Sequence, residues 1–378
     1  MNSKLHVLFL CGWYPSRILP TNGDFIERHA KAVSLKHKVT VIHIVTDKSL
    51  RTNIEIISKQ ENHITTHIAY LKSTNNPLKK IALFGKAFLV ILKKTKSFNI
   101  VHLNEIYPFG IFSLYLKWFK NKRFIISEHF TGYHQPQAKE LTFSQKFISK
   151  IITKNAAFIC PVSNNLRDAM LALNLKGNYF RVPNVVNTSL FFPSENNNQT
   201  FTITHISNML NKHKNVEGFL RVVKKLESKI AHFKVQLIGE NSIQYKMFIE
   251  KIKINIDKIE FIDHIPHKKV ASYLQSSNLF VLFSNYENLP CVILESFACG
   301  IPVIASNVGG VSEFFPKEFG FLVSPNDEDA LLRKIVTMHR SFKMNKKDMH
   351  NYVEENFSED KIASDFEKLY FNSLKYKL

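Results

Sequence analysis

The stretch Leu279–Phe297, LFVLFSNYENLPCVILESF, constrains the fold of this chain more than any other segment. It begins with an unbroken apolar run of strand length, which is typical of a strand buried on both faces of a parallel sheet. A loop follows over Ser284–Leu289, and Pro290 suits the first position of a helix that carries residues 291–299. The stretch therefore predicts one strand, loop and helix of an α/β protein.

Segments of the same two kinds alternate along both halves of the chain. The polar tract Glu195–Thr200 lies between the two series and is of the kind that links domains. Because about 150 residues make one domain, a chain of 378 residues also favours two. We therefore expect an α/β fold of two facing Rossmann-like, doubly wound domains with a cleft between them. The expected ranges are 1–190 and 191–357, followed by a last helix over 358–378.

The charge of the chain is strongly positive, because 51 lysines and arginines face 31 aspartates and glutamates, a net charge of +20. Nucleic acid, anionic lipid headgroups and phosphorylated substrates all suit such an excess. No helix-turn-helix, zinc-finger, RNP or KH signature accompanies it, so lipid and phosphorylated substrates are favoured over nucleic acid. A generally lysine-rich composition explains the charge equally well.

The apolar runs and the cysteines favour a cytoplasmic protein. No run of about 18 uncharged apolar residues is present to span a bilayer. The first apolar run leads into a Gly-Trp-Tyr-Pro loop, which predicts a strand and not a signal peptide. The four cysteines show neither CxxC nor Cys/His ligand spacing, so we expect reduced thiols and no metal centre.

A basic amphipathic helix is predicted over Pro77–Phe98. Its apolar stripe consists of Ile81, Phe84, Phe88, Ile91 and Leu92, and its lysines are Lys79, Lys80, Lys86, Lys93, Lys94 and Lys96. Such a helix can lie on an anionic membrane surface, which would make the protein peripheral on the inner face of the cell membrane. Alternatively, the stripe is the core face of an ordinary domain helix.

Four loops of the second half should gather at one sheet edge, because ligands of open α/β sheets bind at the carboxyl ends of strands. These loops are Asn208–Asn215, Gly239-Glu240, Glu287–Pro290 and Asn307–Gly310. Together they offer lysine side chains, the start of a helix, glycines with accessible backbone amides, and carboxylates. Taken alone, the two glutamates of this region are most simply interpreted as surface residues of a solvated helix.

Each group of this set suits one part of a nucleotide sugar. Lys214 can neutralise a diphosphate, helped by the amides of Leu289 or of Gly309-Gly310. Glu295 can accept two ribose hydroxyls, and Glu287 can hold hydroxyls of the attached sugar. A nucleotide sugar fits better than a dinucleotide, because no GxGxxG follows the first strand of either half.

The first half contributes two candidate positions. His129 follows a predicted strand over residues 123–127, and a glycine-containing loop comes next. Gly23 lies in the loop that leads into the first predicted helix. The simpler interpretations are a structural histidine and an ordinary turn.

Six segments, in order along the chain, resemble those of the family-four retaining glycosyltransferases. Residues 284–310, SNYENLPCVILESFACGIPVIASNVGG, resemble the Glu-x7-Glu signature region of that family. The other five are PTNGDFIERHA, SEHFTGY, VPNVVNTSLFFP, ISNMLNKHKN and GFLVSPND. They resemble its glycine loop, histidine segment, segment before the linker, phosphate loop, and late strand and turn. This agreement favours ligand roles for both glutamates.

The resemblance implies the GT-B fold and a role for each candidate residue. On the donor side, it assigns the ribose to Glu295, the sugar to Glu287 with the amides of Asn288 and Leu289, and the diphosphate to Lys214. The resemblance further implies that the first domain binds the acceptor and the second the nucleotide-sugar donor. His129 and Gly23 would approach the transferred sugar from the first domain, and the last helix would cross back onto that domain.

Three positions depart from the family pattern. Asn208 stands where an arginine is common, Asn288-Leu289 where Gly-Phe is usual, and residues 185–187 (VVN) where the family has Gly-Val-Asp. Loss of the arginine weakens the diphosphate clamp, so we expect Lys212 or His213 to assist.

The resemblance implies retaining transfer of a hexose-type sugar from a UDP- or GDP-linked donor. The acceptor would be a hydroxyl of a glycan, a lipid-linked glycan, or a precursor of lipopolysaccharide or exopolysaccharide. No cofactor or metal is expected beside the nucleotide sugar, which is a co-substrate. Two other functions stay open: a nucleotide-sugar epimerase of similar two-domain fold, and a nonenzymatic scaffold on a membrane surface.

Overall fold

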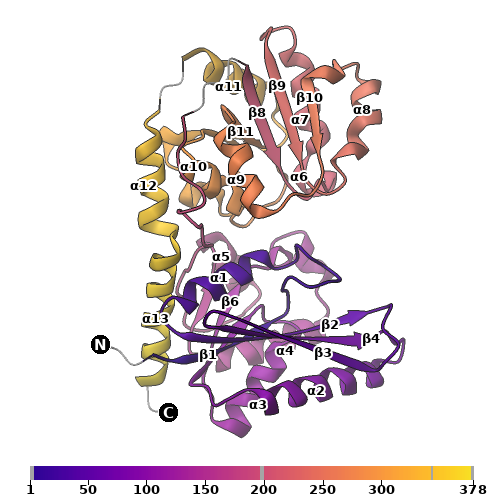
Figure 1. Cartoon of the computed structure of the whole chain (residues 1–378), viewed down its shortest axis with the longest axis vertical. Helices are drawn as coiled ribbons and strands as arrows, with labels where there is room; N and C mark the ends of the chain where they lie inside the picture. Colours follow the sequence, from indigo (N-terminus) through magenta and orange to yellow (C-terminus); the bar gives the residue numbers. More distant parts are fainter. Residues whose placement is uncertain (1–3, 196–199, 342–343, 376–378) are drawn as a thin grey trace. The chain divides into compact units, whose positions relative to one another are not determined.

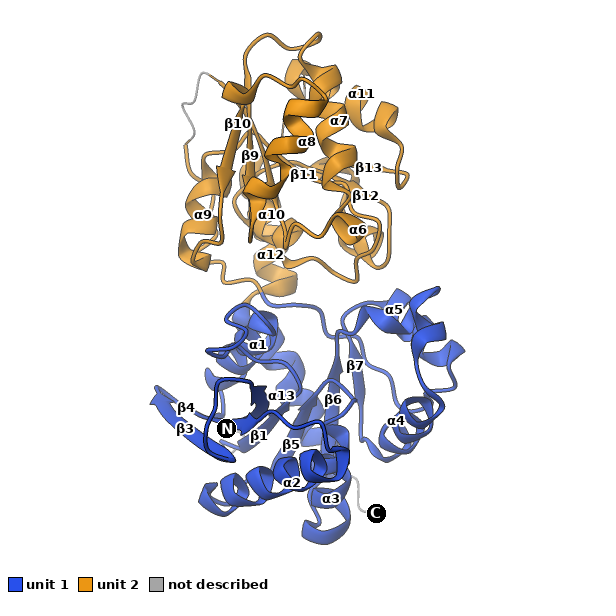
Figure 2. Cartoon of the chain, turned by 90° about the vertical axis from the view of Figure 1, so that its right-hand side faces the viewer, with its two compact units in different colours: residues 1–185, 359–378 blue, residues 186–358 orange. Residues whose placement is uncertain are grey.

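The computed structural model describes residues 4–195, 200–341 and 344–375 of the chain. These residues form two compact units, coloured separately in Figure 2. Unit 1 comprises residues 1–185 and 359–378, and unit 2 comprises residues 186–358. From the sequence we expected the first domain to end at residue 190 and the second at residue 357.

Unit 1 is built on a seven-stranded sheet of order β3-β4-β2-β1-β5-β6-β7, in which all neighbours are parallel except the β3–β4 hairpin. Its strands are β1 His6–Cys11, β2 Lys38–Asp47, β3 Ile54–Glu61, β4 Ile64–Lys72, β5 Ile100–Asn104, β6 Phe124–Glu128 and β7 Ile159–Pro161. Its helices are α1 Asp24–Ser34, α2 Pro77–Lys94, α3 Gly110–Lys120, α4 Phe143–Asn155, α5 Asn164–Ala172 and α13 Glu359–Lys375, with 3-10 turns η1 Thr131–Tyr133 and η2 Gln137–Glu140.

Helices on both faces bury this sheet, which explains why its central strands are mostly apolar, although β5 and β6 also bury His102, Asn104 and Ser127. Helices α1 and α13 pack with β1 in one core that includes Phe9, Ile26 and Phe366. Figure 1 shows α2 and α3 on the other side of the sheet from α1. The last helix is also tied to the sheet by polar contacts, because His102 Nδ1 lies 2.7 Å from the hydroxyl of Tyr370. Helix α13 is therefore part of the unit 1 core.

Unit 2 is built on a six-stranded parallel sheet of order β10-β9-β8-β11-β12-β13. Its strands are β8 Phe201–Ile206, β9 Phe233–Ile238, β10 Ile259–Ile262, β11 Leu279–Leu282, β12 Val303–Ser306 and β13 Gly320–Val323. Its helices are α6 Asn211–Lys214, α7 Val216–Leu226, α8 Lys246–Lys251, α9 His267–Gln275, α10 Cys291–Ala298, α11 Glu328–Ser341 and α12 Lys346–Phe357. Its 3-10 turns are η3 Ser242–Tyr245, η4 Ile256–Lys258, η5 Val311–Phe314 and η6 Lys317–Phe319.

The predicted strand, loop and helix of Leu279–Phe297 are present, with small shifts. We expected Pro290 at the first helical position. It is instead the N-cap residue that precedes the helix, because its ψ of 118° is extended. The expected loop over Asn208–Asn215 contains the one-turn helix α6. Helix α12 was not predicted, since its apolar positions Met349, Val353 and Phe357 are sparse among polar residues.

The apolar stripe predicted for α2 is partly wrong. Phe88 and Ile91 are buried, as the core-face interpretation requires, but Ile81 is 68% exposed. Leu83 and Ala87 take up the buried positions on the same side of the helix. The beginning of α2 therefore leaves Leu78 and Ile81 exposed.

Candidate functional site

The four loops expected to converge in unit 2 follow β8, β9, β11 and β12, which the sheet order places close together. Direct backbone bonds join three of them, those after β8, β11 and β12: the amide of Asn285 donates to the carbonyl of His213 at 2.8 Å, and that of Gly310 donates to the carbonyl of Asn288 at 2.9 Å. Gly309 has φ +57°, and a Cβ there would lie 1.7 Å from the carbonyl oxygen of Glu287. Glycine is thus required where the β11 and β12 loops meet.

Lys214 and Glu287 form an ion pair at this edge, with 2.5 Å between Nζ and Oε1. The same carboxylate oxygen accepts a hydrogen bond of 2.7 Å from the hydroxyl of Ser284. The side chains are 17% and 9% exposed, so the pair is mostly shielded from solvent. A diphosphate that bound Lys214 would compete with Glu287 for the ammonium group, and Glu287 would then become available to another ligand group.

Glu295 lies on α10 and is 3% exposed. Its Oε1 lies 2.8 Å from Nε2 of His267, the first residue of α9. The imidazole ring of His267 packs against Phe191, with ring centroids 4.8 Å apart. Sequence reasoning missed His267, because no spacing rule connects residues 28 positions apart on two separate helices.

Asn208, which stands where the family commonly has an arginine, and its neighbours Lys212 and His213 lie on the loop after β8. Asn208 is exposed, and its side-chain oxygen accepts from the amide of Leu210 at 3.3 Å, so it stabilises its own turn. Lys212 is exposed, and the ring of His213 lies against Tyr286 with centroids 6.0 Å apart. The expected assistance of Lys212 or His213 to Lys214 stays a prediction.

Gly23 and His129 both belong to unit 1, whereas Lys214 and both glutamates belong to unit 2. Gly23 begins α1 with φ +75°, and a Cβ there would lie 2.6 Å from the backbone of Trp13. His129 is buried, and its ring lies 4.4 Å from that of Phe25. Burial, with smaller effects from His29 and His102, holds the pKa of His129 well below its usual value, so its imidazole is neutral.

Two family models together match residues 26–356. The model of glycosyltransferase family 4 matches residues 26–190, and that of glycosyl transferases group 1 matches residues 187–356. The chain belongs to glycosyltransferase family 4.

Relatives of this family-4 protein come from distant organisms. A glycosyltransferase of Methanocaldococcus jannaschii is 25% identical over 94% of this chain and 96% of its own length. A phosphatidylinositol N-acetylglucosaminyltransferase component from Arabidopsis thaliana is 27% identical over 52% of this chain. That alignment spans 44% of the Arabidopsis protein, somewhat less than half its length.

Solved structures confirm the predicted GT-B fold of the family-4 protein. Sucrose-phosphate synthase from Thermosynechococcus elongatus has a TM-score of 0.78 and 19% identity, with 98% of this chain and 99% of that chain covered. HepE of Anabaena, solved in complex with UDP and glucose, has a TM-score of 0.73 and 13% identity over 97% of this chain and 100% of its own.

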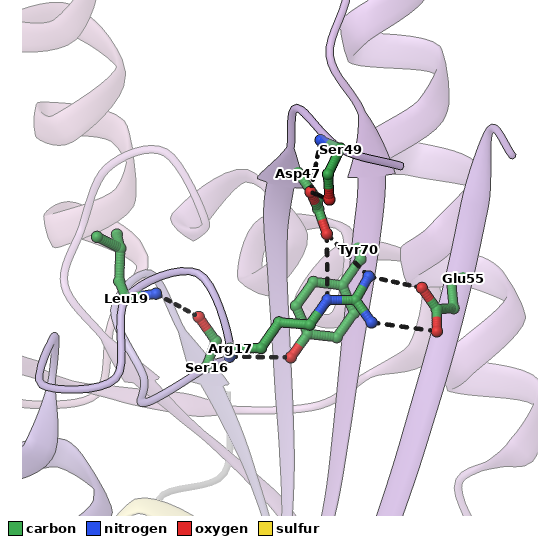
Figure 3. A network of polar contacts seen from close by, with 7 residues as sticks. All are labelled: Ser16, Arg17, Leu19, Asp47, Ser49, Glu55 and Tyr70. Atoms are coloured by element: carbon green, nitrogen blue, oxygen red, sulfur yellow. Dashed lines mark hydrogen bonds and ion pairs between the residues drawn. The ribbon is translucent and has the colours of Figure 1, made fainter. Parts of the chain in front are cut away.

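A feature of the family-4 protein that sequence reasoning did not find supports the loop before Gly23. The guanidinium of Arg17 donates to both carboxylate oxygens of Glu55, at 3.2 and 2.6 Å, and to Oδ2 of Asp47, at 3.1 and 2.8 Å. It also lies 3.8 Å over the ring of Tyr70 (Figure 3). These contacts of Arg17 connect the β1–α1 loop to β2, β3 and β4.

Two features are absent from the described residues of the family-4 protein. Across residues 4–195, 200–341 and 344–375, no helix is long and apolar enough to cross a bilayer. In the same ranges, no group of three or more His, Cys, Asp or Glu is arranged to hold a metal ion.

Proposed function

We propose that this protein transfers a hexose-type sugar from a nucleotide diphosphate sugar to a hydroxyl of a glycan or lipid-linked glycan, with retention of configuration. The observation that carries the proposal is the polar edge of unit 2. There the Lys214–Glu287 ion pair and the buried carboxylate of Glu295 lie at the carboxyl ends of the strands, beside the start of α10. Family membership and the shared GT-B fold support it.

The donor would lie along this edge with its ribose deepest. Glu295, held by His267, offers a buried carboxylate to the ribose hydroxyls. The ammonium of Lys214 would move from Glu287 to the diphosphate, with amides at the start of α10 as further donors. Glu287 would then accept hydroxyls of the sugar. The exchange of partners at Lys214 couples diphosphate binding to sugar binding.

Transfer would break the bond between the anomeric carbon and the diphosphate. A departing phosphate oxygen would take the proton of the acceptor hydroxyl, which attacks from the same face of the sugar. Lys214 would stabilise the charge that develops on the diphosphate, an effect of up to several kcal/mol. The neutral imidazole of His129 can hydrogen-bond a sugar hydroxyl.

The donor nucleotide is tested by calorimetry of the purified protein with UDP, GDP and a panel of their sugars. We expect binding to at least one nucleotide sugar and slow hydrolysis of it without acceptor. Replacing Lys214 by Met should weaken diphosphate binding about 10- to 100-fold, the loss of one charge-assisted contact. The matched control is Lys251→Met, which removes an exposed lysine from α8 of the same unit. No binding of any nucleotide at millimolar concentration would refute the proposal.

An epimerase of similar fold would convert a nucleotide sugar without an acceptor. Incubation with each donor alone, followed by analysis of the sugar released from the nucleotide, separates the two activities. We expect unchanged or hydrolysed donor and no epimer. Formation of an epimer would replace the transferase proposal.

We further propose that unit 1 contacts an anionic membrane surface. Large apolar side chains are exposed on three helices: Leu78 and Ile81 of α2, Trp118 and Phe119 of α3, and Phe143 and Phe147 of α4. Phe88 of α2 stacks on Phe112 of α3 at 4.2 Å, and Lys117 of α3 donates to the carbonyl of Asn155 of α4 at 2.8 Å, so the helices are neighbours. Exposed aromatic residues among lysines suit an interfacial position.

Sedimentation with liposomes tests this contact. We expect the protein to prefer vesicles with phosphatidylglycerol over neutral vesicles and to lose that preference in high salt. The double variant Phe143→Ser/Phe147→Ser should sediment less, while nucleotide binding stays intact. Equal sedimentation with neutral and anionic vesicles would remove the membrane from the proposed partners. A scaffold without enzymatic activity would bind vesicles but hydrolyse no donor.

A further inference from the structure

Unit 1 contains a basic cavity that the proposed function does not use. Its volume is about 730 Å³, within the range of sites for small organic ligands. It lies at the amino ends of β6 and β7, near the ends of α3, α4 and α13. His129 follows the carboxyl end of β6, so the cavity and His129 are at opposite edges of the same sheet.

Three cationic side chains line this cavity, and each comes from a different segment. Lys117 is in the last turn of α3, Arg123 directly precedes β6, and Lys154 is in the last turn of α4. Of the described residues that line the cavity, none is an aspartate or a glutamate. Within the described part of the chain, none of the three cations forms an ion pair with a carboxylate. A cavity lined by one sign of charge concentrates ions of the opposite sign.

Backbone carbonyls use only part of the hydrogen-bonding capacity of these cations. Nζ of Lys117 donates to the carbonyl of Asn155 at 2.8 Å, and Nη1 of Arg123 donates to the carbonyl of Ser373 at 2.5 Å. These bonds satisfy carbonyls in the last turns of α4 and α13, and they hold both side chains in the cavity wall. An ammonium group has three N–H donors and a guanidinium group has five, so most of them remain for a ligand.

Lys117 and Arg123 are also close enough to disfavour each other's charge. Both are half-buried. Burial, and in addition the charge of Arg123, lower the pKa of Lys117 below its usual value. Capping of two helices does not require that the cations share a cavity. An anion in that cavity would offset both effects, because it favours the charged form of the ammonium group.

The loop after α5 forms a further part of the wall and is fixed by the fold. Nδ2 of Asn178 donates to the carbonyl of Ala157 at 3.2 Å, and the carbonyl of Asn178 accepts from the amide of Ile159 in β7 at 2.8 Å. A Cβ at Gly177 would lie 2.5 Å from Cδ1 of Ile159, so this loop packs tightly on the sheet. Tyr179 adds an aromatic ring. The cavity therefore combines cations with apolar surface in walls that the fold holds in place.

A phosphate group suits these side chains better than a carboxylate does. A phosphate monoester carries about 1.5 to 2 negative charges at neutral pH and has three strong acceptor oxygens. The planar guanidinium of Arg123 can bind two of these oxygens at once, with Lys117 and Lys154 as further donors. We infer that this cavity binds a phosphate group, carried by either a soluble ester or a lipid headgroup. The inference concerns a second site and does not depend on the transferase proposal.

Calorimetry with glycerol 3-phosphate tests the inference. The proposed donor site can also bind phosphate, so the titrations use the full-length Lys214→Met protein, in which that site is weakened. At constant ionic strength we expect saturable binding that is tighter than that of acetate by about tenfold or more. Arg123→Gln should weaken it about 10- to 100-fold, and Lys154→Gln about threefold, because Lys154 is exposed. Lys139→Gln, which removes an exposed lysine from η2 of the same unit, is the matched control.

A second arm distinguishes the two sources of the phosphate group. Dihexanoylphosphatidylglycerol, a short-chain lipid used below its micellar concentration, is titrated beside glycerol 3-phosphate. Tighter binding of the lipid identifies a headgroup, and tighter binding of glycerol 3-phosphate identifies a soluble ester. Either result supports the inference, provided that Arg123→Gln weakens the binding.

The inference is overturned if glycerol 3-phosphate, inorganic phosphate and the short-chain lipid all fail to bind at millimolar concentration. It is also overturned if Arg123→Gln and Lys154→Gln bind as tightly as Lys139→Gln, because the anion then lies elsewhere, or if acetate binds equally well. Should thermal melting show that Arg123→Gln is unfolded, Arg123→Lys is compared with Lys139→Gln by the same criterion, because it keeps the charge but loses the planar fork. Failure of nucleotide binding would refute the proposed function and leave this inference unchanged.

Discussion

Replacing Glu295 is the most direct test of how the donor is held. Glu295 is 3% exposed, so its carboxylate has already lost its water shell on folding and nucleotide binding need not remove it. Hydrogen bonds to a charged group contribute about 1.5–3 kcal/mol each. For Glu295→Ala we expect a loss of about 2–3 kcal/mol, which weakens UDP or GDP about 30- to 150-fold. Glu295→Gln keeps one acceptor oxygen and should lose about fivefold.

His267 gives this prediction a second arm. Its ring lies 2.8 Å from Glu295 and is 36% exposed, so the pair is only partly shielded. His267→Ala should cost about 1 kcal/mol or less, because it removes a positioning contact and leaves the carboxylate in place. The affinities are measured by calorimetry with the nucleotide alone, so no acceptor is needed. Thermal melting of each variant checks the fold.

The matched control is Glu250→Ala, which removes an exposed glutamate from α8 of the same unit. The reasoning is refuted if Glu295→Ala binds the nucleotide within about threefold of the wild type. It is also refuted if Glu250→Ala loses as much affinity as Glu295→Ala, since the effect would then be one of net charge.

Three further predictions concern glycine, arginine and histidine. Gly309→Ala should destabilise unit 2 and weaken donor binding, because the added Cβ would lie 1.7 Å from the carbonyl oxygen of Glu287. Calorimetric melting measures the loss of stability, and an unchanged melting midpoint would contradict the prediction. Arg17→Lys should loosen the β1–α1 loop, seen as faster amide exchange there at unchanged nucleotide affinity. The pKa of buried His205 is lowered to about 4, so its contribution to stability is complete above about pH 6.5 and is lost as the pH falls toward 4. Urea unfolding measures this. As the pH falls over that range, the free energy of unfolding of the His205→Gln variant should decrease by about 3 kcal/mol less than that of the wild type.

Local sequence patterns were sufficient for most of the elements, although they missed helices α6 and α12. The apolar run that begins at Leu279 predicted a buried parallel strand, because a strand covered on both faces is mostly apolar. The same reasoning placed Lys214, Glu287 and Glu295 near the carboxyl edge of one sheet. The apolar period was partly misleading at α2, where Ile81 belongs to the predicted apolar stripe but is 68% exposed.

Contacts between distant residues were decided by the tertiary structure. Lys214 and Glu287 are 73 positions apart and meet because β8 and β11 are neighbours in the sheet. His267 meets Glu295 through the packing of two helices. Lys117, Arg123 and Lys154 line one cavity because α3 and α4 end beside the start of β6. A sequence determines which side chains its elements carry, because propensity and period are local. Strand order and helix packing determine which of those side chains share a site, because they join segments that no local rule connects.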